Sequence, residues 1–142
     1  MNDLIKRIEC LEKDLHENLH EYPLFQEILD DIYDKRIPEI DKLLYKNEEF
    51  YYREAIKKLI KLNDYIKDTS KDIDKQYKLF DKQAIEWNKY VYINADKSIV
   101  DSMNEKSHKA NKLINSHKIE DLHEANKIMH ELINKAKYYN NK

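Results

Sequence analysis

The sequence predicts an all-α fold of about six amphipathic, antiparallel helices, arranged as two three-helix repeat units. The 142-residue chain has no Gly and only two Pro, so tight hairpin turns that need positive φ are nearly excluded. Charged residues make up 38% of the chain and apolar residues recur every three or four positions, which is typical of a helical bundle with a narrow core. Two stretches of the chain also resemble each other.

These two stretches lie seventy residues apart. Residues 42–66 read KLLYKNEEFYYREAIKKLIKLNDYI, and residues 112–136 read KLINSHKIEDLHEANKIMHELINKA, with identities that include Glu54 with Glu124 and Ala55 with Ala125. An apolar seam in the first helix extends the likeness, because it returns 69 residues later; its members Leu4, Ile8, Leu11 and Leu15 match Ile73, Tyr77, Phe80 and Ala84. We therefore expect unit 1–68, unit 69–138 and a frayed tail at 139–142.

The first repeat is expected to contain helices at about 3–22, 24–46 and 47–66. Pro23 ends the first helix. Asn18 interrupts its apolar seam, either as a polar residue that fixes the helix register or as part of a frayed helix end. Pro38 falls inside the second helix and removes a backbone donor, which predicts a kink near Ile37. Asn47 is a suitable cap for the third helix.

The second repeat is expected to contain helices at about 69–91, 96–114 and 119–136. Asp68-Thr69-Ser70 predicts a break, after which Thr69 and Asp72 resemble a capping box. The fourth helix then carries an apolar stripe from Ile73 to Val91. The register shift between the copies implies one extra residue in the first copy beside Pro38, where a bulged or kinked helix can absorb it.

Composition narrows the function classes. A net charge of −2 argues against a dedicated nucleic-acid binder, which carries a basic face. No apolar run approaches the roughly 20 residues of a membrane span, so we expect no membrane partner. The single cysteine, Cys10, has no internal disulfide partner and favours a reducing, cytoplasmic setting.

Histidine and glutamate motifs raise the question of a metal site. Residues 16–20 read HENLH, a literal HExxH in which His16 and His20 share a helix face with Glu17 between them. These residues lie off the apolar seam, and the chain shows no evident third ligand or catalytic triad. We therefore assign no catalytic, cofactor-binding or metal residue and expect no enzyme activity. A small helical metal-binding protein that uses His16–His20 remains the alternative.

Glu-x-x-His pairs of the kind found in di-iron bundles also occur, but away from the apolar stripes; they are Glu17/His20, Glu105/His108 and Glu120/His123.

Tyrosine is the more informative excess. Eleven Tyr residues occur in the chain, and Tyr45, Tyr51, Tyr65 and Tyr92 fall beside the apolar stripes. Tyr on a helix surface offers a large contact area at modest entropic cost, which suits a protein interface. Packing at the edge of the core explains the same pattern.

Residues 106–136, KSHKANKLINSHKIEDLHEANKIMHELINKA, resemble the helical hairpins in the C-terminal region of bacterial Hsp70-type chaperones. Residues 39–66 resemble a second such hairpin. The resemblance implies a non-catalytic helical lid or tail module, with client polypeptides or co-chaperones as protein partners. It carries over no functional residue. Another possibility is a self-assembling coiled-coil scaffold, a homo-oligomer formed through the first helix.

Overall fold

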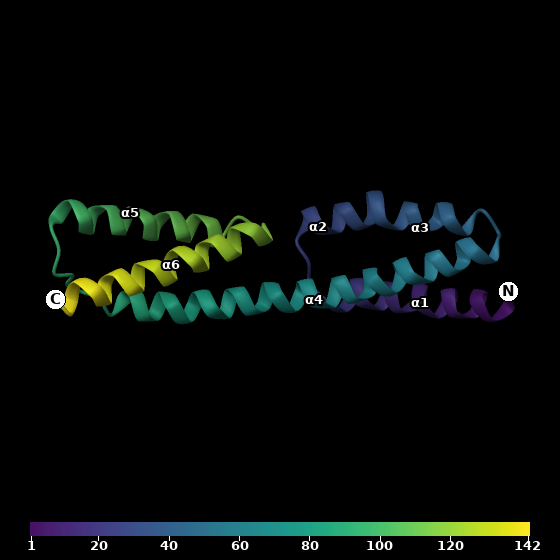
Figure 1. Ribbon diagram of the computed structural model, residues 1–142, viewed down its shortest axis with the longest axis horizontal. Helices are drawn as coiled ribbons and strands as arrows, with labels where there is room; N and C mark the ends of the chain where they lie inside the picture. Colours follow the sequence, from purple (N-terminus) through teal and green to yellow (C-terminus); the bar gives the residue numbers. More distant parts are fainter. The chain divides into compact units, whose positions relative to one another are not determined.

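The computed structural model describes all 142 residues and contains helices and no strands (Figure 1). The helices are α1 (Asn2–Glu21), α2 (Gln26–Asp31), the π-helical turn η1 (Ile32–Arg36), α3 (Ile37–Leu44), α4 (Glu49–Asn88), α5 (Lys97–Ile114) and α6 (Ile119–Asn140). The all-α prediction is thus confirmed. No helix has both the length and the apolar character that crossing a membrane requires.

Contacts divide the chain into two compact units, unit 1 (Met1–Asp72) and unit 2 (Ile73–Lys142). Unit 1 contains α1, the continuous run α2–η1–α3 and residues 49–72 of α4; unit 2 contains residues 73–88 of α4, α5 and α6. Within each unit, consecutive helical segments run in opposite directions (Figure 1). The sequence predicts a division after residue 68 and a tail from residue 139, whereas α6 continues through Asn140.

The predicted helix break at Asp68-Thr69-Ser70 is wrong, because α4 passes through this segment without interruption. Thr69 and Ser70 are each 8% exposed, and they continue a stripe of buried positions from Ile66 to Ile73. A Ser or Thr inside a helix costs at most about 0.7 kcal/mol relative to Ala. An unbroken buried stripe therefore outweighs the weak helix propensity of these residues.

The helical run α2–η1–α3 contains one π turn just before Pro38. The amide of Ile37 donates to the carbonyl of Ile32, five residues earlier instead of four. Pro38 follows in the first turn of α3 and has no amide hydrogen to donate. A π turn holds one residue more than the α-helical turn that it replaces. The structure thus has an irregularity where the sequence predicts a kink.

The core of unit 1 is one apolar cluster drawn from all three of its helical segments. Its buried members are Ile8, Leu15, Ile32, Ile40, Tyr52, Ala55, Ile56, Leu59, Leu62 and Ile66. The first-helix seam belongs to this cluster, with Leu4 and Leu11 packed at its margin. The seam that the coiled-coil hypothesis needs for pairing with another subunit is therefore covered within the chain.

A buried amide pair joins α1 to α4 inside this apolar core. The Asn18 side-chain amide donates to Asn63 Oδ1 at 2.9 Å, and the Asn63 amide donates to the Leu11 carbonyl at 3.2 Å. Asn18 is only 7% exposed, so it lies in the core and not at a frayed end. Because the bonds form at one helix alignment only, they fix the register of α1 against α4.

Unit 2 has a corresponding apolar core with its own buried amide contact. The buried apolar residues are Ile73, Phe80, Ile93, Met103, Ala110, Ile114, Leu122, Ala125, Ile128, Met129, Leu132, Ile133 and Ala136. Asn126 on α6 donates to the main-chain carbonyl of Gln76 at 2.9 Å and to Gln76 Oε1 at 2.8 Å. These bonds set the register of α6 against α4.

Replacing Asn18 by Ala should destabilise unit 1 by about 1–3 kcal/mol, because Asn63 Oδ1 would stay buried without its donor. Urea denaturation followed by circular dichroism measures the change. The double variant Asn18→Leu/Asn63→Leu removes both polar groups and should be nearly neutral or stabilising. An Asn18→Ala protein as stable as the parent would show that the amide pair contributes nothing.

Glu12 on α1 supplies a pH-dependent test of the packing between α1 and α3. Partial burial raises the pKa of Glu12, and the carboxylates of Asp41 and Glu9 raise it further. A raised folded-state pKa means that ionisation of Glu12 opposes folding once the pH rises through that pKa. Glu12→Gln should therefore stabilise the protein at pH 7, by up to about 0.5 kcal/mol after solvent screening.

The gain should vanish in acid, below the pKa of a carboxyl in the unfolded chain, where Glu12 is protonated in both states. Thermal melts at both pH values measure it, with Glu17→Gln as an exposed control on the same helix. A gain that persists unchanged in acid would contradict this electrostatic origin.

Candidate functional site

The HExxH residues lie on the exposed side of α1. His16, Glu17 and His20 are all exposed, while the neighbouring Leu15 and Asn18 face the core. No group of three or more His, Cys, Asp or Glu side chains in the structure is suited to hold a metal ion.

The remaining Glu-x-x-His pairs are exposed on α5 and α6, and the structure does not bring them together; they are Glu105/His108 and Glu120/His123.

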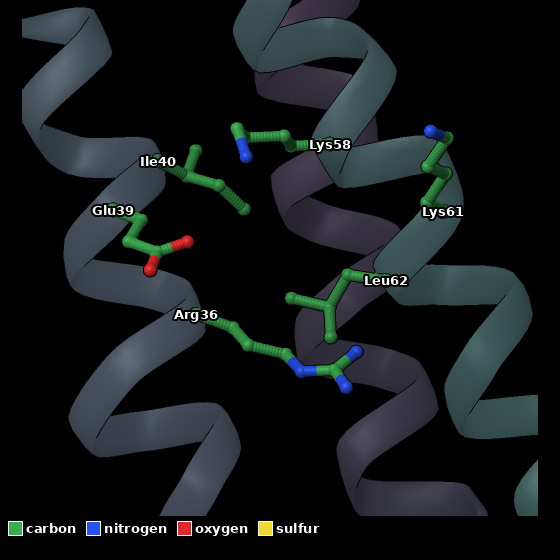
Figure 2. Close-up of a pocket in the computed structure, with 6 residues that line it drawn as sticks. All are labelled: Arg36, Glu39, Ile40, Lys58, Lys61 and Leu62. Atoms are coloured by element: carbon green, nitrogen blue, oxygen red, sulfur yellow. The ribbon is translucent and has the colours of Figure 1, made fainter.

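A small cleft opens in unit 1 between α3 and α4 (Figure 2). Its volume is about 220 Å³, below the roughly 300–1,000 Å³ of sites that hold drug-sized ligands. The run η1–α3 and helix α4 line it from opposite sides, with Arg36, Glu39, Ile40, Lys58, Lys61 and Leu62. We call this feature the α3–α4 cleft. It has room for one or two side chains but not for a nucleotide cofactor.

Arg36 is held in place at one end of the cleft. Its Nε donates to Asp31 Oδ2 at 3.0 Å, and its guanidinium lies 4.0 Å from the centre of the Tyr65 ring. Figure 2 shows the Arg36 side chain reaching from its own helix toward Leu62 on α4. The bond to Asp31 uses Nε, which leaves the two terminal amino groups to bind another acceptor.

The remaining charged groups of the cleft are not paired with one another. Lys58 and Lys61 are exposed on α4, and neither forms an ion pair. Glu39 extends from α3 into the gap, while the Lys58 ammonium points toward Ile40 (Figure 2). Cations thus outnumber acids along the lining, and buried Ile40 and Leu62 form an apolar floor.

A second exposed feature lies at one end of unit 2. Ile85 is 64% exposed, Val91 97%, Tyr92 72% and Tyr138 61%, and half-buried Tyr90 lies in the same loop as Val91. We call these five residues the tyrosine end. The sequence predicts Val91 on the buried stripe of a helix, and this prediction is wrong because α4 ends at Asn88. Contiguous exposed apolar patches mark interaction surfaces, and Ile85 and Tyr90 line one shallow hollow in this part of unit 2.

The loop of the tyrosine end is fixed by a side chain from α6. Asn140 Oδ1 accepts from the Asn94 amide at 2.8 Å, and Asn140 Nδ2 donates to the Tyr92 carbonyl at 3.0 Å. Nearby, Lys137 on α6 pairs with Glu86 on α4 at 3.1 Å. Because these contacts hold the loop backbone, Val91 and Tyr92 are presented in a defined position, which lowers the entropic cost of binding.

Sequence reasoning missed the cleft and found only part of the tyrosine end, because it named Tyr92 among the candidate interface residues. The cleft needs Arg36 and Lys58, which are separated in sequence and are brought together only by packing of α3 on α4. The tyrosine end had a visible signal, because Tyr90-Val91-Tyr92 is an aromatic run directly before Asn94 and Asp96, residues that favour turns.

No protein-family model, curated protein or solved structure matches this chain.

Replacing Asn140 by Ala should release the loop of the tyrosine end, because the Asn94 amide and the Tyr92 carbonyl both lose their partner. Hydrogen exchange of the main-chain amide of Asn94 should accelerate by about tenfold, corresponding to a net loss of about 1 kcal/mol of local stability. Asn134→Ala, an exposed amide on the same helix, serves as the control. Unchanged exchange at Asn94 would show that the clamp does not order the loop.

Proposed function

We propose that this protein is a non-catalytic helical module that binds another protein through the tyrosine end of unit 2. The observation that carries the proposal is the exposure of Val91 and Tyr92 on a loop whose backbone is clamped by Asn140. A rigid loop loses little entropy on binding, and Tyr is among the residues that contribute most to protein interfaces.

The kind of partner follows from the Hsp70-like hairpin pattern in the sequence. We infer that the partner is a client polypeptide or a co-chaperone in the cytoplasm. An apolar, aromatic patch suits an unfolded client, because such a chain exposes apolar side chains that a folded protein buries. The exposed, unpaired Cys10 is compatible with a reducing compartment.

We also propose that the two units are copies of one duplicated three-helix unit. Each unit contains three helical segments, and the matching seams begin at Leu4 and Ile73. The extra residue that the register shift requires in the first copy has a natural place in the π turn at Ile32–Arg36, beside Pro38. A kink of the helix near Ile37 belongs to the same proposal.

Binding of a permanently unfolded model polypeptide tests the function. Fluorescence anisotropy of labelled, reduced and carboxymethylated α-lactalbumin should rise as the protein is titrated in. Val91→Ser/Tyr92→Ser should weaken this binding by about tenfold or more, because two exposed contact residues are lost.

Tyr33→Ser provides the control, since Tyr33 is 54% exposed but belongs to unit 1. It should change the affinity by less than about twofold, as expected of a surface residue outside a binding patch. Equal losses in the two variants, or no binding by the parent protein, would contradict the proposal.

A further inference from the structure

We propose that the α3–α4 cleft binds a carboxylate-bearing segment of a partner protein. A Glu or Asp side chain of that segment would lie between Arg36 and Lys58, and a neighbouring apolar side chain would lie against Ile40 and Leu62. The proposal rests on the interaction function above, but it concerns a different surface in a different unit.

The position of Arg36 favours an anion with a flat, two-oxygen head. Asp31 and Tyr65 already hold the guanidinium, so little side-chain entropy remains to be lost on binding. The two terminal amino groups are the edge of the guanidinium that pairs bidentately with a carboxylate. Arg36 thus provides a preformed half of such a pair.

The π turn explains why this Arg is available at the cleft. One extra residue in Ile32–Arg36 changes the angular position of η1 residues relative to the helix that precedes them. Arg36 is the last residue of the turn, and its side chain reaches across the gap toward α4 (Figure 2). π turns frequently occur at functional sites.

The charge balance favours a single carboxylate. Arg36 and Lys58 extend toward the gap, where Glu39 is the acid that lines it with them. Lys61 also lines the cleft, but its ammonium points away from the gap (Figure 2). The net charge of Arg36, Lys58 and Glu39 is one positive charge, which matches one carboxylate better than it matches a phosphate dianion. A nucleic-acid backbone would need an extended basic face instead. Because Lys58 and Lys61 have no partner within the chain, binding breaks no existing ion pair at either residue.

The size and floor of the cleft select a peptide side chain with an apolar neighbour. A volume of about 220 Å³ accommodates one or two side chains. Ile40 and Leu62 are 4% and 3% exposed, so they offer a limited apolar contact and lie beneath the charged rim. An apolar residue and an acidic residue two positions apart along an extended segment point to the same side and meet both requirements.

A short fluorescent peptide of Ser-Glu-Leu repeats is the probe, and its Ser-Gln-Leu counterpart is the neutral control. The parent protein should bind the Glu peptide at least about tenfold more tightly, because Gln removes the charge and keeps the shape. The Nε–Hε resonance of Arg36 should shift during the titration. Equal binding of the two peptides, or a stationary Arg36 resonance, would overturn the proposal.

Two charge-reversal variants on α4 distinguish direct contact with the peptide from long-range electrostatic attraction. Lys58→Glu should weaken binding of the Glu peptide by at least about tenfold, whereas Lys57→Glu should change it by less than about threefold. Lys57 is the matched control because it is an exposed neighbour that pairs with Glu54 and does not line the cleft. Lys61→Glu is a second cleft variant. Equal losses at Lys57 and Lys58 would reject a binding site in the cleft.

The two proposals fail separately. Loss of acidic-peptide binding in Lys58→Glu with unfolded-polypeptide binding intact supports a distinct acidic-segment site in unit 1. If the parent protein binds the unfolded polypeptide but not the Glu peptide, the cleft proposal is wrong and the function stands. If it binds the Glu peptide but not the unfolded polypeptide, the tyrosine-end proposal is wrong and the cleft assignment stands.

Discussion

The buried stripe along α4 is the constraint on which both units depend. This helix supplies core residues to each of them, including Leu59 and Ile66 in unit 1 and Ile73 and Phe80 in unit 2. Within each unit the stripe advances by three or four residues at each step, so one face of the helix segment is buried in the core of that unit. Hydrogen bonds of buried side-chain amides align α1 against α4 in unit 1 and α6 against α4 in unit 2. Both proposed binding surfaces use residues of α4 or of the loop that follows it.

The buried side-chain amides of the two units do not occupy corresponding sequence positions. With a shift of 70 residues, Asn63 corresponds to Ile133, and Asn126 corresponds to Ile56. A helix that packed in the place of its counterpart would therefore set an amide against an apolar side chain. An unsatisfied buried amide costs about 1–3 kcal/mol, which penalises such exchanged pairings. If the units arose by duplication, this difference keeps two similar helix sets from pairing incorrectly.

Much of the fold follows from the sequence, because helical periodicity is a local property. The stripes of α1 and α6 fall where the spacing of apolar residues predicts them. The predicted break at Asp68-Thr69-Ser70 is wrong. The low helix propensity of these residues favours a break, but burial of Thr69 and Ser70 favours a continuous helix. The cleft is not predictable in this way. It depends on how far α3 lies from α4 and on which way Arg36 turns, and neither is encoded in spacing along one helix.

Because of the π turn, unit 1 is more sensitive to the number of residues in Ile32–Arg36 than to their identity. An α-helix turns by about 100° per residue, so deletion of one residue from Ile32–Arg36 that restored regular α-helix would rotate α2 against α3 by that amount. Ile28 and Ile40 would then no longer face the same core. A single-residue deletion here therefore rotates one helix face out of the core. We expect it to be far more disruptive than most substitutions at the same positions. The helical run accommodates the additional residue of the π turn because the apolar positions before and after the turn are spaced so that both face the core.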